Sequence, residues 1–211
     1  YKGFFHKLIA YDNLLTGLRY LSSALSHHPY TGNGRNLSYR KELFFKHKGY
    51  YQSLNLHAGD DDLFINEAST KENTKVIYTP DSLTEMDPIE RFGVWKEMKV
   101  SRAATQRYYK GNTSTFYHLE STCFFLFQAS VIATVVIGLQ GNWLISLIAI
   151  LLYLIRFIIK AIVFGKSARM LQQNPTTGWL FLLEFIQPLF NGYIRIYRLF
   201  KSKKDYTFSL S

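Results

Sequence analysis

A stretch without any charged residue lies between Glu120 and Arg156, and it constrains this chain more than any other feature. A helix of a soluble domain shows a polar face to water about once per turn, so an uncharged run of this length is typical of a membrane anchor. Two apolar runs, at about 121–139 and 143–163, each approach the ~20 residues that cross a bilayer core. The short turn at 140–142 predicts a helical hairpin, and a buried bundle of a soluble protein is the alternative.

Charges that follow the uncharged stretch predict how the hairpin lies in the membrane. Arg156 and Lys160 are four residues apart on one helical face, and we expect them to snorkel toward the nearer interface. Lys166 and Arg169 come next, whereas the turn carries no charge. The positive-inside rule therefore predicts that the N-terminal head lies in the cytoplasm.

A third apolar segment, at about 178–200, contains Glu184 and Pro188 and is followed by lysines. A third crossing would put those lysines on the far side of the membrane, against the positive-inside rule. We therefore expect an amphipathic helix that lies at the membrane surface. These segments together make 116–211 a membrane anchor.

The head, residues 1–115, is rich in charge. It holds 16 of the 25 basic and 12 of the 15 acidic residues, and the chain has a net charge of +10. This charge favours anionic lipid or phosphate-bearing ligands, and we find no nucleic-acid motif. Cys123 is the single cysteine and no histidines have metal-ligand spacing, which argues against disulfides and a zinc enzyme. The missing initiator Met suggests a start partway through a longer protein.

A glycine-punctuated turn, GNGRNLSYRK, begins at Gly32. Gly34 permits close backbone approach to another group, and Arg35 and Asn36 follow it with side chains that suit phosphate or hydroxyl groups. An ordinary surface turn with solvated side chains is the alternative.

Three adjacent carboxylates, Asp60, Asp61 and Asp62, stand in the segment GDDDLFIN. Adjacent negative charges repel one another, and crowding raises the proton affinity of one carboxylate toward that of a general base. The alternative is that Asp60 or Asp61 caps a helix beginning near Leu63.

Two further elements complete the head. The run at 76–80 alternates like a short β-strand, and a helix is expected after Asp87 and Pro88. That helix presents Trp95, Lys99 and Arg102, and the two cations lie one turn apart. Such a pair suits a diphosphate, and a surface helix facing acidic lipid explains it equally well.

The order of these features resembles the C-terminal half of glycosyltransferase family 2 enzymes, especially membrane-bound bacterial members with a C-terminal hydrophobic hairpin. The motifs that carry the resemblance are GNGRNLSYRK, GDDDLFIN, the run at 76–80 and a Trp followed by Lys99 and Arg102. The resemblance implies an α/β class: a partial GT-A-like catalytic domain, mostly helical with a few short strands, followed by the hairpin and the amphipathic helix. The family's QxxRW motif is not intact here.

The resemblance also implies the chemistry. It implies inverting transfer of a sugar from a nucleotide-sugar to a saccharide or lipid-linked acceptor at the membrane. It makes Asp61 the base, Asp60 its acidic neighbour and Asp62 the fallback. It assigns Gly34, Arg35, Asn36, Trp95, Lys99 and Arg102 to substrate and diphosphate. A divalent metal, Mg or Mn, would be held mainly by an N-terminal half that this sequence lacks. The alternative is a non-enzymatic adaptor that binds acidic lipid, or an inactive fragment.

Overall fold

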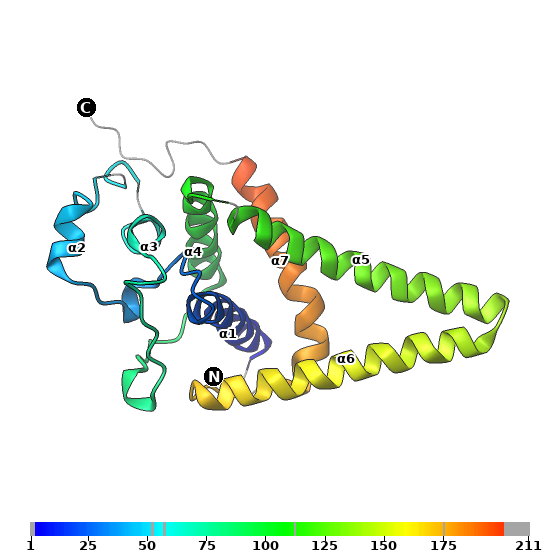
Figure 1. Cartoon of the computed structure of the whole chain (residues 1–211). Coiled ribbons are helices and arrows are strands. Elements are labelled where there is room, and N and C mark those ends of the chain that lie inside the picture. Colours follow the sequence, from blue (N-terminus) through cyan, green and yellow to red (C-terminus); the bar gives the residue numbers. More distant parts are fainter. Residues whose placement is uncertain (1–2, 52, 57, 112, 175, 201–211) are drawn as a thin grey trace.

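The computed structural model describes residues 3–51, 53–56, 58–111, 113–174 and 176–200. Its elements are, in order, α1 (Phe4–Leu25), η1 (Gly34–Asn36), α2 (Lys41–Lys46), α3 (Asp62–Ala68), η2 (Pro80–Ser82), α4 (Phe92–Thr105), η3 (Gln106–Tyr108), α5 (Thr113–Gln140), α6 (Trp143–Met170), η4 (Thr177–Trp179) and α7 (Leu180–Leu199). Figure 1 shows a helical head from which the long α5–α6 hairpin projects.

The expected α/β class is wrong for this chain. About 70% of the structure is helical, and the described residues form no strand or sheet. The run at 76–80, expected as a strand, is irregular backbone that leads into η2, and the Ile77 side chain is 68% exposed. A strand needs a neighbour to pair its backbone groups, and no described segment supplies one here, so water solvates them instead.

The hydrophobic core lies where four helices meet. Its buried members are Leu8, Ile9, Tyr11 and Leu14 of α1, Trp95 of α4, Phe164 and Ala168 of α6, and Leu180 and Leu183 of α7. α7 contacts both α1 and α4 and crosses the wide end of the hairpin (Figure 1). The head and the base of the hairpin therefore share one core.

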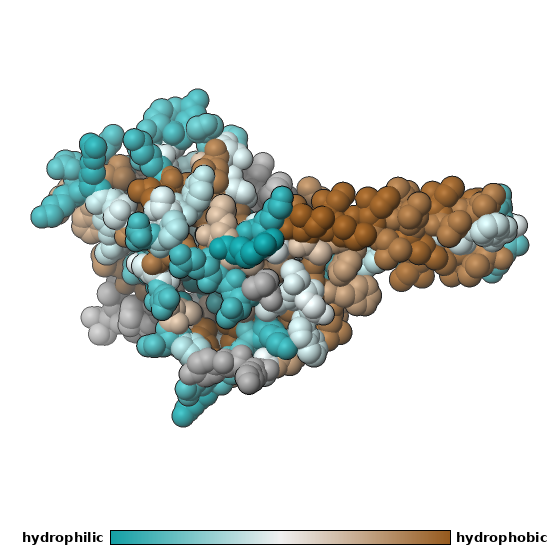
Figure 2. Space-filling view, turned by 90° about the horizontal axis from the view of Figure 1, so that it is seen from below, coloured by the Kyte–Doolittle hydropathy of each residue, from teal (hydrophilic) through white to brown (hydrophobic). Residues whose placement is uncertain are grey.

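The predicted helical hairpin is present. Residues 119–140 of α5 and 143–170 of α6 are long and apolar enough to cross a membrane, and few of their side chains are buried inside the protein. Figure 2 shows the hairpin as a hydrophobic arm extending from a largely hydrophilic head. Asn142 caps α6 by accepting a hydrogen bond from the Leu144 N–H over 3.0 Å, which starts the second helix directly after the turn.

α7 has an inverted distribution of polarity. Glu184 and Gln187 are buried on its inner side together with Leu180 and Leu183, at helical spacing. Large apolar side chains on the same helix are exposed instead, namely Phe181, Leu182, Leu189, Ile196 and Leu199. A helix with apolar residues outside and acidic or amide groups inside is suited to contact with lipid.

Arg156 and Lys160, which the sequence predicts to snorkel toward an interface, pair with an acid of α7. Both cations contact one carboxylate oxygen of Glu184 on α7, Arg156 Nη2 at 2.5 Å and Lys160 Nζ at 2.9 Å. Side chains on a helix lean toward its N-terminus, which for α6 is the hairpin turn. That direction leads away from the head and toward the apolar arm, and the pairing with Glu184 gives both cations an acidic partner there.

Candidate functional site

The acidic segment starts α3. Asp61 is the N-cap of this helix, and its Oδ1 accepts a hydrogen bond from the Asp62 N–H over 2.8 Å. The capping role considered for the sequence is therefore present. It occupies one oxygen of the carboxylate and fixes the plane of the group.

The second oxygen of Asp61 joins the acidic segment to the glycine turn. The Gly34 N–H donates to Asp61 Oδ2 over 2.7 Å, across 27 residues of sequence. A Cβ at position 34 would lie 3.2 Å from the Asp61 Cβ, tighter than nearly all real Cβ contacts. Glycine is favoured at position 34, because a Cβ there would make the Asp61 side chain shift by a few tenths of an ångström.

The glycine turn places polar groups around Asp61. Gly34 and Arg35 lie in η1, and both are exposed. The Asn36 amide donates to the Ser82 carbonyl over 2.8 Å and so ties the turn to η2. Each carboxylate oxygen of Asp61 keeps a second lone pair beyond its backbone hydrogen bond. The arrangement can accept a proton or a hydroxyl hydrogen bond at a fixed position.

Asp62 has a different environment from Asp61. It is buried, and its Oδ2 accepts hydrogen bonds from Thr105 Oγ1 over 2.5 Å and from the Tyr109 hydroxyl over 2.9 Å. The Tyr109 hydroxyl also lies 3.0 Å from Thr31 Oγ1. Asp62 thus links α3 to the end of α4. The hydrogen bonds of this polar cluster also help to hold Asp61, the preceding residue, in place.

Burial changes the titration of Asp62. Desolvation raises the pKa of Asp62, and the neighbouring Asp61 charge adds a smaller increase. The hydrogen bonds from Thr105 and Tyr109 oppose this rise. The main cause of the raised pKa of Asp62 is therefore burial and not the crowding of adjacent charges. Desolvation likewise raises the pKa of the Tyr109 hydroxyl.

Asp60 is the exposed member of the acidic segment. The turn, Asp60 and Asp61 together form one solvent-facing polar site, which we call the Asp61 site. It consists of Gly34, Arg35, Asn36, Asp60 and Asp61.

Trp95, Lys99 and Arg102 lie apart from the Asp61 site. The Trp95 side chain is 2% exposed and stacks on Phe190 of α7, with ring centroids 4.3 Å apart. Lys99 Nζ pairs with Asp12 of α1 at 2.7 Å. Arg102 is exposed and lies near Tyr20 of α1. In the described part of the chain, none of the three makes a hydrogen bond or ion pair with the acidic segment.

The expected divalent metal has no ready-made cluster of ligands among the described residues. They include no group of three or more His, Cys, Asp or Glu side chains placed to hold one. Asp61 and Asp62 direct their oxygens at N–H and O–H donors. We therefore derive no step through a metal in this chain.

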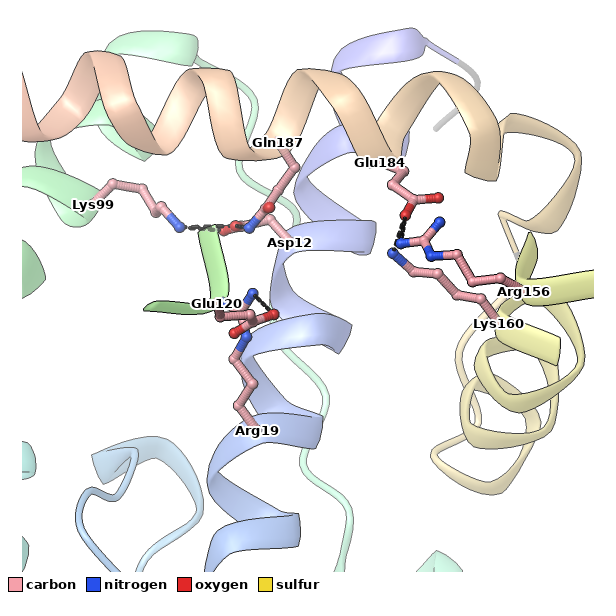
Figure 3. A network of polar contacts seen from close by, with 8 residues as sticks. All are labelled: Asp12, Arg19, Lys99, Glu120, Arg156, Lys160, Glu184 and Gln187. Atoms are coloured by element: carbon pink, nitrogen blue, oxygen red, sulfur yellow. Dashed lines mark hydrogen bonds and ion pairs between the residues drawn. The ribbon is translucent and has the colours of Figure 1, made fainter. Parts of the chain in front are cut away.

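Sequence reasoning missed the residues that support Asp62. Thr31, Thr105 and Tyr109 come from three separate segments, and no spacing rule links them. It also missed the pairing of Asp12 with Lys99 and Gln187, and that of Glu184 with α6 (Figure 3). The one available signal was the isolated acid Glu184 within an apolar segment, because such a charge needs a partner. No protein-family model, curated protein or solved structure matches this chain.

Proposed function

We propose that this chain forms the acceptor-side and anchoring portion of a membrane-bound enzyme that transfers a sugar from a nucleotide-sugar donor to a hydroxyl acceptor. The observation that carries the proposal is the 2.7 Å hydrogen bond from the Gly34 N–H to Asp61. It joins the two motifs on which the family resemblance rests into one exposed site.

Asp61 is the general base in this proposal. The acceptor hydroxyl gives its proton to the Asp61 carboxylate while its oxygen bonds to the anomeric carbon of the sugar. The bond from that carbon to the diphosphate breaks, and the nucleoside diphosphate leaves with the electron pair. Two backbone N–H groups orient the carboxylate, and a fixed base near a positioned hydroxyl is what such a displacement needs.

Arg35 is the cation we assign to phosphate or acceptor binding. It directly follows Gly34, whose N–H contacts Asp61, and Arg35 is exposed. Guanidinium groups bind phosphate oxygens through paired N–H donors. Lys99 is already paired with Asp12, so Arg35 suits this role better than Lys99 does.

The hairpin suits attachment of the Asp61 site to a membrane surface. We propose the inner membrane with the head in the cytoplasm, because Lys166 and Arg169 are exposed at the head end of α6 and the turn at 140–142 has no charge. A cysteine at Asn142, in a Cys123→Ser background, should react with a membrane-impermeant thiol reagent outside intact cells. Protection there, with reaction of a cysteine at Glu85 instead, would reverse the orientation.

The decisive test is Asp61→Asn in the protein as it is encoded in its host, with release of nucleoside diphosphate from a panel of nucleotide-sugars as the readout. Asn caps a helix about as well as Asp, so folding should persist. Loss of a general base should lower turnover by about 10²–10⁴-fold. Asp87→Asn, an exposed carboxylate outside the site, is the matched control.

Turnover within a few-fold of the wild type in Asp61→Asn would refute the base assignment. No release of nucleoside diphosphate from any donor in the panel would favour the adaptor function instead.

A further inference from the structure

Arginines from three helices come together at the head end of the hairpin. They are Arg19 of α1, Arg102 of α4, and Arg195 and Arg198 of α7, and we call them the arginine junction. Arg198 donates a hydrogen bond to the carbonyl of Ala103, the residue after Arg102. Arg102 in turn lies near Tyr20, the residue after Arg19. α1, α4 and α7 thus each contribute a cation to one place.

Arg195 shows that these cations act on one another. Burial has the largest effect in lowering the pKa of its guanidinium, and the positive charges of Arg19 and Arg198 lower it further. Like charges that are held together repel, so the arrangement costs free energy that an anion bound among them would recover.

Interaction with helix ends accounts for only part of the arginine junction. Arg102 and Arg198 lie in the last turns of α4 and α7, where a cation is stabilised by the helix dipole. Arg19 and Arg195 lie further back in their helices, and the last turn of α1 holds no basic residue. A ligand explains why these two arginines join the others.

Glu120 places the arginine junction at the level of the lipid headgroups. Its Oε1 pairs with Arg19 Nη2 at 2.7 Å (Figure 3), and it stands at the head end of the apolar span 119–140 of α5. Gln140 follows Glu120 by 20 residues, which is about 30 Å at 1.5 Å per residue and equals the thickness of a hydrocarbon core. A hairpin whose turn reaches the far face of the core therefore holds Glu120 and Arg19 at its near face.

The surroundings of the arginine junction combine accessible charge with apolar surface. Arg102 is exposed, and the side chain of Arg19 is 23% exposed, so a ligand can reach both. α7 also exposes Ile196 and Leu199, which directly follow Arg195 and Arg198 in the sequence. A ligand that suits both features has a negative headgroup and an apolar chain.

We propose that the arginine junction binds the terminal phosphate of a membrane lipid, a phosphomonoester or diphosphate, whose chain lies against the exposed apolar side chains of α7. A terminal phosphate has about two negative charges and three acceptor oxygens, and a phosphodiester has fewer of both. Guanidinium groups bind phosphate oxygens through paired N–H donors, so several arginines favour the group with more oxygens. The site does not depend on the sugar-transfer proposal, because lipid binding is measured without turnover.

The test is native mass spectrometry of the full chain in detergent, titrated with phosphatidic acid, phosphatidylglycerol or phosphatidylcholine. Phosphatidic acid has a terminal phosphate, whereas the other two lipids are phosphodiesters. The wild type should bind phosphatidic acid at least about tenfold more tightly than either of them, because more charge-assisted hydrogen bonds form.

Arg195→Gln should weaken the binding of phosphatidic acid about tenfold, because it removes a charged donor from the centre of the site. The matched control is Arg91→Gln. Arg91 is exposed at the N-terminal end of α4, the end opposite Arg102, and its side chain does not cap the helix. That variant should bind phosphatidic acid as the wild type does.

A second variant tests the same site at an exposed position. Arg102→Gln should leave the helix content by circular dichroism unchanged and should weaken the binding of phosphatidic acid about threefold or more. If Arg195→Gln loses helix content, Arg102→Gln carries the comparison with Arg91→Gln.

Three results would overturn the proposal. The first is a wild type that binds none of the lipids, or binds all three equally. The second is equal binding of phosphatidic acid by the wild type, Arg102→Gln and Arg91→Gln. The third is a rise in melting temperature with inorganic pyrophosphate that equals the rise with phosphatidic acid at the same concentration, since that would identify a free-anion site.

Discussion

The Gly34 N–H lies 2.7 Å from Asp61 Oδ2, and this hydrogen bond joins two turns that are 27 residues apart in sequence. The contact leaves little room for a side chain at position 34, where a Cβ would come within 3.3 Å of the same oxygen. The orientation of the Asp61 carboxylate therefore depends on a backbone group of the glycine turn. A substitution at Gly34 therefore changes the position of the Asp61 carboxylate and leaves the carboxylate group itself unaltered.

Gly34→Ala should displace Asp61 while leaving the fold in place. We expect a loss of stability of about 1 kcal/mol, since the site is exposed and can relax. We expect turnover, measured as release of nucleoside diphosphate, to fall about 10- to 100-fold because a misplaced base is costly. Amide hydrogen exchange at position 34 should become faster, which is a readout independent of activity.

Gly93→Ala is the matched control for this change. A Cβ at Gly93 would meet nothing within 4 Å, and the residue lies in α4. That variant should keep its activity and should gain or retain stability. Equal turnover in Gly34→Ala and Gly93→Ala would contradict the link between the two turns.

The buried Asp62 should make stability depend on pH in a defined direction. Burial raises its pKa in the folded protein above the ordinary value of the unfolded chain. Its contribution to stability is then fully present below the unfolded pKa and is lost as pH rises through the folded pKa. The free energy of unfolding of the wild type, minus that of Asp62→Asn, should decrease from about pH 4 toward neutrality.

Thr105→Val sharpens the pH prediction. The Thr105 hydroxyl donates to Asp62 and thereby opposes the rise in its pKa. Removing that donor should raise the pKa of Asp62 further and move the loss of stability to higher pH. Chemical unfolding in detergent, followed by circular dichroism at a series of pH values, measures both effects. A difference between wild type and Asp62→Asn that grows with pH would show that the sign is wrong.

Lys99 should matter for stability more than for catalysis. Its Nζ pairs with Asp12, whose side chain is 3% exposed and also accepts from the Gln187 amide over 2.9 Å. Lys99→Met leaves that carboxylate buried beside one neutral donor and should cost about 3 kcal/mol. The double variant Lys99→Met with Asp12→Leu should recover much of the loss, which a double-mutant cycle measures. A large fall in turnover without a loss of stability would instead restore Lys99 to the substrate site.

The hairpin was predictable because apolarity is a local property of the sequence. A run without charge fixes a helix of bilayer length whatever the rest of the chain does, and the turn at 140–142 ends the first helix and caps the second. The cap at Asp61 is local in the same way. It needs only an acidic residue directly before an apolar helical segment.

Features that depend on distant partners were not predictable. The alternation at 76–80 looks like a strand, yet strand formation depends on a neighbouring strand, and Ile77 is left exposed. Asp62 and Glu184 are buried because Thr105 and Lys160 meet them across the fold. No sequence pattern around either acid predicts which residue will be its partner. The hydrogen bond between Gly34 and Asp61 was not predicted, since the family resemblance only gave both residues roles in the same reaction.

Close packing near the turn of the hairpin yields a further prediction. A Cβ on Gly138 of α5 would lie 2.7 Å from the Ser146 backbone nitrogen of α6, and Ser146 donates its hydroxyl to the Val135 carbonyl over 2.8 Å. Gly138→Ala must therefore push the two helices apart and lengthen that hydrogen bond. We expect a loss of about 1–3 kcal/mol, because overpacking a close helix contact forces backbone shifts.

Gly141→Ala separates this packing effect from a general effect of removing glycine at the turn. The nearest atom to a Cβ at Gly141 is the Ile137 carbonyl oxygen, 3.7 Å away, which is an ordinary contact. Thermal unfolding in detergent should show a lower melting temperature for Gly138→Ala and a value near the wild type for Gly141→Ala. Spin labels at Leu139 and Leu144, in a Cys123→Ser background, should report a longer distance only in Gly138→Ala. Unchanged distances and melting in that variant would mean that the helices meet less closely than described.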